Sequence, residues 1–177
     1  MSSQPLKWSF NLRGSTPQVD VAGGTIREAN ASTFPALSDN GLAIYLLELQ
    51  PGAIRIPHWH PDAAELDYCL EGAAVISIGS PTGDFVRVEL AAGMISVIPQ
   101  GWFHYIANPG EGPMRVLVIF NNSQPNDIGI SEGFRGVPDE VLALTFGVDA
   151  ARFAGIDRNV GYIAPQGQAG SNPGPIS

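Results

Sequence analysis

The sequence predicts an all-β fold of the jelly-roll or β-barrel type, with an N-terminal arm and a helical segment near the C-terminus. The chain of 177 residues is 44% apolar and 15% charged, as expected for one globular domain with a substantial core. Its 21 glycines and 15 prolines are spread along the chain and separate short apolar runs. About ten of these runs have strand length, and many short strands between turns are typical of barrels and jelly rolls.

The chain divides into four parts by composition. Residues 1–41 form the N-terminal arm and first strands, and residues 42–120 form the barrel core. Residues 121–163 contain a lid-like polar loop and the C-terminal helices. Residues 164–177 are rich in Gly, Pro, Ser and Gln, which predicts a flexible tail.

In the arm, Trp8, Phe10 and Leu12 alternate with polar residues, which predicts a docked strand. The Gly23–Gly24 pair predicts a turn, and residues 25–28 predict a short strand.

The barrel core contains short apolar or alternating runs bounded by Gly, Pro and Asn. These runs predict strands at residues 42–49, 54–60, 67–70, 74–78, 85–90, 95–98, 103–106 and 114–120.

The chain changes character after residue 120. Residues 121–130 are polar and irregular. Pro138 followed by two acidic residues predicts the start of a helix, and Gly147 predicts its end. Residues 149–153 predict a second short helix.

The overall charge restricts the partners. A net charge of −8 and a pI near 4.6 argue against nucleic acid and anionic membranes, because both bind basic surfaces. No apolar run approaches the ~20 residues that span a bilayer. The N-terminus lacks the apolar core of a secretory signal, and Cys69 is the single cysteine. We expect a cytoplasmic location, although a mature secreted form would have the same composition.

Four side chains predict a metal site. The chain has 3 histidines, and His58 and His60 point to one face of a strand because side chains alternate with a period of two. Glu65 follows closely, and His104 lies at a second strand. Three imidazoles and one carboxylate leave open positions on a six-coordinate metal, which suits Fe²⁺ or Mn²⁺. The ligand types do not exclude a catalytic Zn²⁺.

The spacing of these residues resembles both motifs of the cupin family. The first motif is met by Gly52, His58, His60, Glu65 and Gly72. The second motif is met by Gly93, Pro99, Gly101, His104 and Asn108. The resemblance implies a cupin jelly-roll β-barrel with one metal inside, bound by the three histidines and the glutamate.

Longer runs resemble one half of the two-domain oxalate decarboxylases. These runs are GGTIREANASTFP, PGAIRIPHWHP, FHYIANPGEGP and PDEVLALTFGV. The resemblance implies Mn²⁺ as the metal. It also implies that Arg55, three residues before the first histidine ligand, holds the substrate carboxylate. Plant germins, which resemble the chain less closely, usually carry Asn there, so Arg55 favours the decarboxylase branch.

Arg55 and His58 are three residues apart, so strict alternation would place them on opposite faces of the strand. A bulge at Pro57 would re-aim Arg55. A guanidinium pairs bidentately with a carboxylate, which suits the implied role. The alternative is a surface arginine in solvent or in a salt bridge.

The resemblance also implies a mobile lid with a glutamate that handles the proton during loss of CO₂. Residues 121–131 occupy the corresponding place and contain no glutamate. Their acid is Asp127, and Glu132 follows just beyond. Asp127 is therefore a candidate catalytic residue, with a turn or cap role as the alternative.

These residues predict a metal-dependent enzyme acting on oxalate or a similar small carboxylate, with a decarboxylase or oxidase outcome. One alternative is a different cupin enzyme, such as an Fe²⁺ dioxygenase or an isomerase. Another is a protein that uses the metal to bind a carboxylate without turnover. Related cupins pair through the arm and the C-terminal helices, which implies a homodimer or larger homo-oligomer.

Aromatic side chains near the ligands are expected either to line the cavity or to fill the core. They are Trp59, Tyr68, Phe103, Tyr105 and Phe120.

Overall fold

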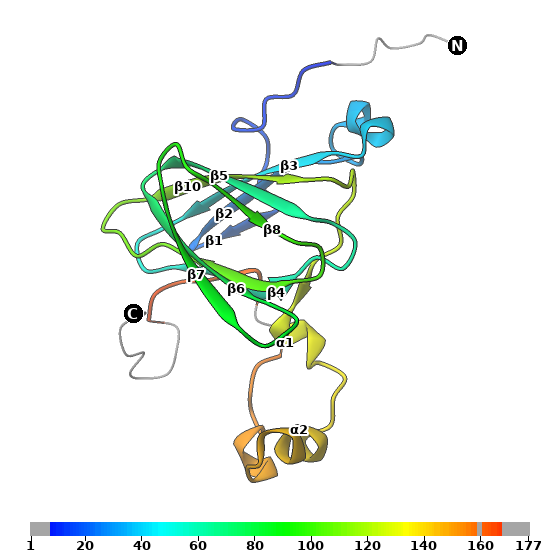
Figure 1. The fold of residues 1–177 in the computed structure, drawn as a ribbon, viewed down its shortest axis with the longest axis vertical. Helices are drawn as coiled ribbons and strands as arrows, with labels where there is room; N and C mark the ends of the chain where they lie inside the picture. Colours follow the sequence, from blue (N-terminus) through cyan, green and yellow to red (C-terminus); the bar gives the residue numbers. More distant parts are fainter. Residues whose placement is uncertain (1–7, 159–160, 168–177) are drawn as a thin grey trace.

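Two antiparallel sheets form the barrel in the computed structural model, which describes residues 8–158 and 161–167 (Figure 1). The first six-stranded sheet has the strand order β1-β2-β3-β10-β5-β8. Its strands are β1 (Val19–Val21), β2 (Gly24–Ala29), β3 (Ala43–Leu49), β10 (Met114–Phe120), β5 (Glu65–Glu71) and β8 (Ile95–Ile98). Neighbours in this sheet come from distant parts of the chain, so barrel closure fixes which residues meet.

The second sheet has the strand order β11-β4-β9-β6-β7, and β12 pairs with β4 outside this path. Its strands are β4 (Ile54–Trp59), β6 (Ala73–Gly79), β7 (Phe85–Ala91), β9 (Phe103–Ala107), β11 (Ile128–Gly129) and β12 (Ile163–Ala164). The two short strands at β4 bring the C-terminal part of the chain against the strand that carries His58.

The helices are short and lie outside the barrel. They are η1 (Pro35–Asn40), α1 (Ile130–Gly133), α2 (Asp139–Phe146) and η2 (Ala150–Arg152). Figure 1 shows α2 at the end of a loop that projects from the sheets. Leu142 of α2 is buried, whereas Leu144 is 84% exposed. In the described part of the chain, no helix is long and apolar enough to cross a membrane.

The predicted strands of the barrel core and the two predicted C-terminal helices are confirmed. Gly147 ends α2 in a left-handed conformation, as its position predicts. Residues 25–28 lie in β2, which confirms the short strand of the arm.

The strand expected around Trp8 is wrong. No strand precedes Val19 among the residues that the structure describes, and Trp8 is 77% exposed. Phe10 stacks on Phe34 with a centroid distance of 5.4 Å, so a ring contact explains part of the aromatic pattern.

Two expectations near the C-terminus are modified. Residues 121–130, expected to be irregular, include the short strand β11. The tail expected from residue 164 begins with β12, and its residues 168–177 lie outside the described part.

A β-bulge shapes β4 at the position expected for Pro57. Arg55 pairs with Ile106 and His58 pairs with His104, so β4 has one more residue than β9 between these pairs. The extra residue cancels the alternation of side chains and places Arg55 and His58 on the same face. Both side chains are buried.

The core lies between the sheets and is closed at one end by Asn108. Its side-chain NH₂ donates to the carbonyl oxygens of Leu49 and Gly112, and its Oδ1 accepts from the N–H of Gly110. The side chain of Asn108 thus provides hydrogen-bond partners for backbone groups at the end of β3 and in the loop after β9. This gives the asparagine of the second motif a structural role.

Gly72 provides a test of the predicted turn between β5 and β6. Its φ is 75°, and a Cβ there would lie 2.9 Å from the carbonyl oxygen of Pro113. We expect Gly72→Ala to lower the free energy of unfolding by about 1–2 kcal/mol, because a side chain is strained in this conformation. Chemical denaturation at matched protein concentration measures the change.

Gly136→Ala is the control. The φ of Gly136 is outside the left-handed region, and a Cβ there would meet open space. We expect its free energy of unfolding to stay within about 0.5 kcal/mol of the wild type. Equal effects of the two substitutions would contradict the strain at Gly72.

Candidate metal centre

The four predicted ligands converge between the two sheets. His58 lies on β4 and pairs directly with His104 on β9, whereas Glu65 comes from β5 of the other sheet. His60 follows β4 at its end. One ligand atom from each residue lies within 4.8 Å of the others, and all four residues are buried. Such a group of donors can hold one metal ion.

Backbone carbonyls orient all three imidazoles. The Nδ1 atoms of His58, His60 and His104 lie 2.7, 2.8 and 2.9 Å from the carbonyl oxygens of residues 56, 126 and 102. A carbonyl oxygen only accepts, so Nδ1 carries the hydrogen in each ring. Each Nε2 therefore keeps its lone pair for a metal, as in established metal-binding histidines.

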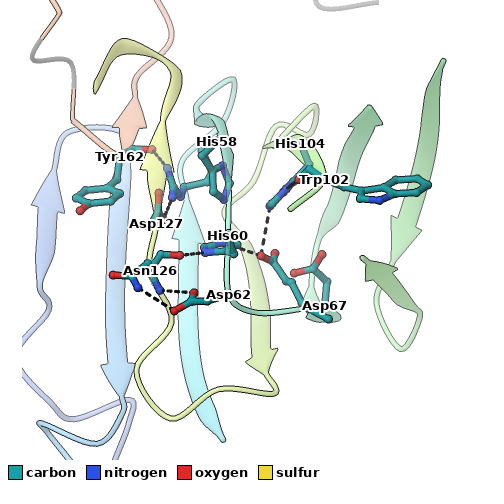
Figure 2. Close-up of polar contacts among 12 residues, drawn as sticks. His58, His60, Asp62, Asp67, Trp102, His104, Asn126, Asp127 and Tyr162 are labelled. Atoms are coloured by element: carbon teal, nitrogen blue, oxygen red, sulfur yellow. Dashed lines mark hydrogen bonds and ion pairs between the residues drawn. The ribbon is translucent and has the colours of Figure 1, made fainter. Parts of the chain in front are cut away.

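The atoms that face one another lack hydrogen-bond partners. The Nε2 of His60, the Nε2 of His104 and the Oε2 of Glu65 are buried without a hydrogen bond. Glu65 Oε2 lies 3.0 Å from the first nitrogen and 3.3 Å from the second (Figure 2). These short approaches bring three lone-pair-bearing atoms together. Buried polar atoms normally have partners, so this cluster fits a divalent cation.

The local electrostatics favour the metal-binding forms of His58 and Glu65. Burial lowers the pKa of His58 well below its usual value, and nearby Arg55 lowers it further. Burial by itself would raise the pKa of Glu65, but His104 and His60 outweigh it and hold that pKa well below its usual value. His58 is therefore neutral and Glu65 is ionised near neutral pH. Burial by itself would lower the pKa of His60, but the adjacent Glu65 outweighs it and raises that pKa, so a metal would displace a proton from His60.

Asp67 is a buried acid that sequence reasoning missed. It lies two residues after Glu65 on β5, so both carboxyl groups share a face of the strand. Burial and the charge of Glu65 raise the pKa of Asp67 well above its usual value. Ser96 Oγ donates to its Oδ2 at 3.2 Å. The two-residue period in the sequence was the available sign that Asp67 would face inward.

Arg55 lies in the same cavity as His58 and is 4% exposed. Its Nη1 donates to the carbonyl oxygen of Tyr162 at 3.2 Å, and its Nη2 pairs with Asp127. The guanidinium carbon also lies 5.0 Å from the centroid of the Tyr162 ring. Arg55 and Asp127, predicted separately, are thus brought together. Tyr162 was missed because its position depends on the pairing of β12 with β4.

The segment that carries Asp127 is anchored to the loop after β4. The backbone N–H and side-chain amide of Asn126 donate to the carboxylate of Asp62 at 2.9 and 2.8 Å. The carbonyl of Asn126 also contacts the ring of His60. Figure 2 shows Asn126 and Asp127 on one side of the histidine cluster and Asp67 on the other. Residues 124–127 of the segment expected as a lid therefore line the cavity beside the candidate ligands. Glu132 lies farther along, exposed on α1.

A cavity of about 420 Å³ connects the ligand cluster, Arg55 and Asp127. Phe120 lines it, as expected, but Trp59, Tyr68, Phe103 and Tyr105 do not. Those four alternate with inward-facing residues on their strands, so their side chains point away from the cavity. Trp59, for example, packs on Phe103 with a centroid distance of 6.2 Å.

Two glutamates of β5, one a predicted ligand and one not, test the metal-binding role of Glu65. We expect Glu65→Gln to weaken binding of Mn²⁺ by on the order of 100-fold, because it removes the charged oxygen ligand. Elemental analysis of the purified protein and calorimetric titration with Mn²⁺ measure the stoichiometry and the affinity. The first measurement also identifies the native metal.

Glu71→Gln is the matched control, because Glu71 ends the same strand, is exposed and pairs with Arg115. We expect it to bind Mn²⁺ like the wild type. Unchanged binding by Glu65→Gln would contradict the ligand role.

Comparisons with known proteins identify relatives by sequence. The profile of the family described as Cupin matches residues 10–152. Germin-like protein 3-7 of Oryza sativa is 33% identical over 132 residues, which cover 72% of this chain and 57% of the relative. Nectarin-1 of Nicotiana langsdorffii x Nicotiana sanderae is 31% identical over 131 residues, with coverage of 72% and 57%. The chain thus spans less than two thirds of the length of these relatives.

Solved structures give the same fold. A structure of Bacillus subtilis oxalate decarboxylase, described by its Mn(II) centres, has a TM-score of 0.85 and 21% sequence identity. It covers 93% of this chain, which matches 43% of the longer protein. The same enzyme at pH 4.6 has a TM-score of 0.80. The profile match over most of the chain, together with this fold, shows that the protein belongs to the cupin family.

Proposed function

We propose that this protein is a Mn²⁺-dependent cupin enzyme that acts on oxalate or a similar small carboxylate. The observation that carries the proposal is a buried guanidinium, Arg55, in the same cavity as the candidate metal ligands. A metal and a cation in one cavity suit an anionic substrate. The relatives support this proposal, since the similar solved structures are of oxalate decarboxylase with Mn(II) centres.

Arg55 would bind the substrate carboxylate. A buried guanidinium requires an anionic partner, and Asp127 is that partner in this structure. A substrate carboxylate can replace the carboxylate of Asp127 with the same charge and geometry. The bond from Arg55 to the carbonyl of Tyr162 and its contact with the Tyr162 ring would hold the guanidinium in place during this exchange.

The candidate ligands would hold Mn²⁺, which offers open coordination positions and redox chemistry to a bound carboxylate. The chain's own residues would control the proton. Decarboxylation of oxalate to CO₂ and formate replaces a C–C bond by a C–H bond, so a proton must be delivered to carbon. Oxidation to CO₂ and H₂O₂ instead consumes O₂.

Asp127 is the acid best placed to handle that proton. Its Oδ2 faces Arg55, and its Oδ1 is buried without a hydrogen-bond partner. Once a substrate takes its place on Arg55, Asp127 loses its counter-ion and gains affinity for a proton. We propose that this exchange couples substrate binding to proton delivery.

Replacing Arg55 tests the carboxylate role. We expect Arg55→Ala to lower kcat/KM for oxalate by roughly 10- to 150-fold, equivalent to about 1.5–3 kcal/mol for a charged hydrogen bond. Assays of CO₂, formate and H₂O₂ measure turnover, and elemental analysis should show unchanged metal content. Arg87→Ala, at an exposed side chain on β7, is the control and should retain full activity. Loss of metal from Arg55→Ala would instead assign Arg55 to the metal centre.

Replacing Asp127 tests proton handling. We expect Asp127→Asn to lower kcat by about 100-fold or more, as is typical for loss of a general acid or base, with metal content unchanged. Glu132→Gln, at the exposed acid on α1, should leave kcat unchanged. If Asp127→Asn lowers KM and leaves kcat intact, Asp127 only blocks Arg55 and takes no part in proton transfer.

A further inference from the structure

The cavity extends well beyond the candidate metal centre. Its volume of about 420 Å³ lies in the range of about 300–1,000 Å³ that holds drug-sized ligands. Oxalate consists of two joined carboxylates and would fill only the part beside Arg55 and the histidines. The remaining part is lined by residues of β2 and β3.

Glu28 and Tyr45 form a second polar group in this cavity. Strand register places Glu28 beside Tyr45, Tyr45 beside Val118, and Val118 beside Asp67, in one row across the sheet. Asp67 faces inward, so the other members of the row do as well. β2 lies three strands from β5, or roughly 14 Å along the sheet at ~4.8 Å per strand. Glu28 is therefore remote from Glu65 although both line the same cavity.

Glu28 has hydrogen-bond donors but no counter-ion. Its Oε2 accepts from the side-chain amide of Asn30 at 2.9 Å, and the same amide lies 3.5 Å from the hydroxyl oxygen of Tyr45. It forms no ion pair within the described part of the chain. Burial, followed by the charge of Asp127, raises the pKa of Glu28, and burial also raises the pKa of Tyr45. A carboxyl and a phenol thus face the cavity in a half-buried setting.

Two amides complete this end of the cavity. The Oε1 of Gln18 accepts from the backbone N–H of Glu28 at 3.0 Å, and the Oε1 of Gln124 accepts from Ser32 Oγ at 3.0 Å. Both glutamines line the cavity. Their NH₂ groups form no hydrogen bond to the residues that the structure describes. Both glutamines are exposed, so a ligand would replace water at their NH₂ groups.

We propose that, among the carboxylates that can bind at Arg55, the preferred substrate is a polyhydroxylated one, with its carboxylate at Arg55 and its hydroxylated tail at Glu28 and Tyr45. This inference rests on the proposed function and names its substrate class. A hydroxyl both donates and accepts, which matches a carboxyl, a phenol and two amides. An apolar tail would displace water from these groups without replacing its hydrogen bonds, so the site would discriminate against such a ligand.

A hydroxylated tail fits better than a cationic tail. Arg55 already acts on Glu28 as a nearby positive charge. A second cation would be repelled by Arg55, whereas a neutral hydroxyl would not. An ammonium group only donates hydrogen bonds, so it could not accept one from the NH₂ groups of Gln18 and Gln124.

Binding of matched acids to the Mn²⁺-loaded protein tests the inference by calorimetry. D-gluconate and 2-hydroxyhexanoate share chain length, the carboxylate and the neighbouring hydroxyl that can chelate a metal, but only gluconate carries outer hydroxyls. We expect gluconate to bind at least about tenfold more tightly. The C4 pair L-threonate and 2-hydroxybutyrate repeats the comparison at shorter length, where the preference should be smaller.

Variants assign the preference to Glu28. We expect Glu28→Leu to remove the tenfold preference for gluconate, because it removes the group that the outer hydroxyls bind and that penalises an apolar tail. Glu28→Gln keeps the shape and the hydrogen-bonding capacity of the side chain, so it should retain most of the preference. It thereby separates the loss of hydrogen bonds in Glu28→Leu from a folding defect. Glu89→Leu, on the exposed face of β7, is the matched control and should behave like the wild type.

Three results would overturn the inference. Equal binding of the paired acids by the wild type, or an unchanged preference in Glu28→Leu, removes the hydroxyl site but leaves the carboxylate function standing. Tighter binding of 6-aminohexanoate than of gluconate would assign the site to a cation. Binding of Mn²⁺ without binding of any of the acids or oxalate would refute the proposed function, and this inference with it.

Discussion

The buried cluster of three imidazoles and one carboxylate is the constraint on which the rest of the site depends. An ionised carboxylate deep in a barrel costs several kcal/mol unless a cation or hydrogen bonds compensate it. Without a metal, only protons on His60 and His104 can offset the charge of Glu65, and a divalent ion would replace those protons. Backbone carbonyls already fix the three rings in the tautomer that a metal requires. The barrel is thus prepared for a divalent ion.

The bulge in β4 connects this centre to the rest of the cavity. Without the extra residue, Arg55 would point away from His58, and the guanidinium would lie outside the barrel. The same strand pairs with β11 and β12, which deliver Asp127 and Tyr162 to Arg55. The bulge thus places Arg55 beside the metal ligands, and pairing with β11 and β12 adds Asp127 and Tyr162.

The cavity is chemically asymmetric. One end is dominated by Glu65, the histidines and Arg55, which suit a metal and a carboxylate. The other end contains the carboxyl group of Glu28 and the phenol of Tyr45, whose pKa values are both raised by burial. A ligand that uses both ends must be longer than oxalate and polar along its length. The volume of the cavity and the residues that line it therefore both favour a hydroxylated carboxylate.

The sequence alone determined the cupin fold, most of the barrel strands and the candidate ligand set. These depend on local periodicity and on spacing within short segments, such as His58 and His60 on one strand face. It also determined that Pro57 could re-aim Arg55. Only the tertiary structure decided that Asp127 pairs with Arg55, that Asp67 lies buried beside Glu65, and that Glu28 and Tyr45 face the same cavity. Four of the five aromatic residues expected near the ligands point away from the cavity, as the alternation on their own strands requires, and the strand expected near Trp8 was wrong. Neighbours across a barrel, such as Arg55 and Asp127, are set by strand order and register between distant segments, which local periodicity does not encode.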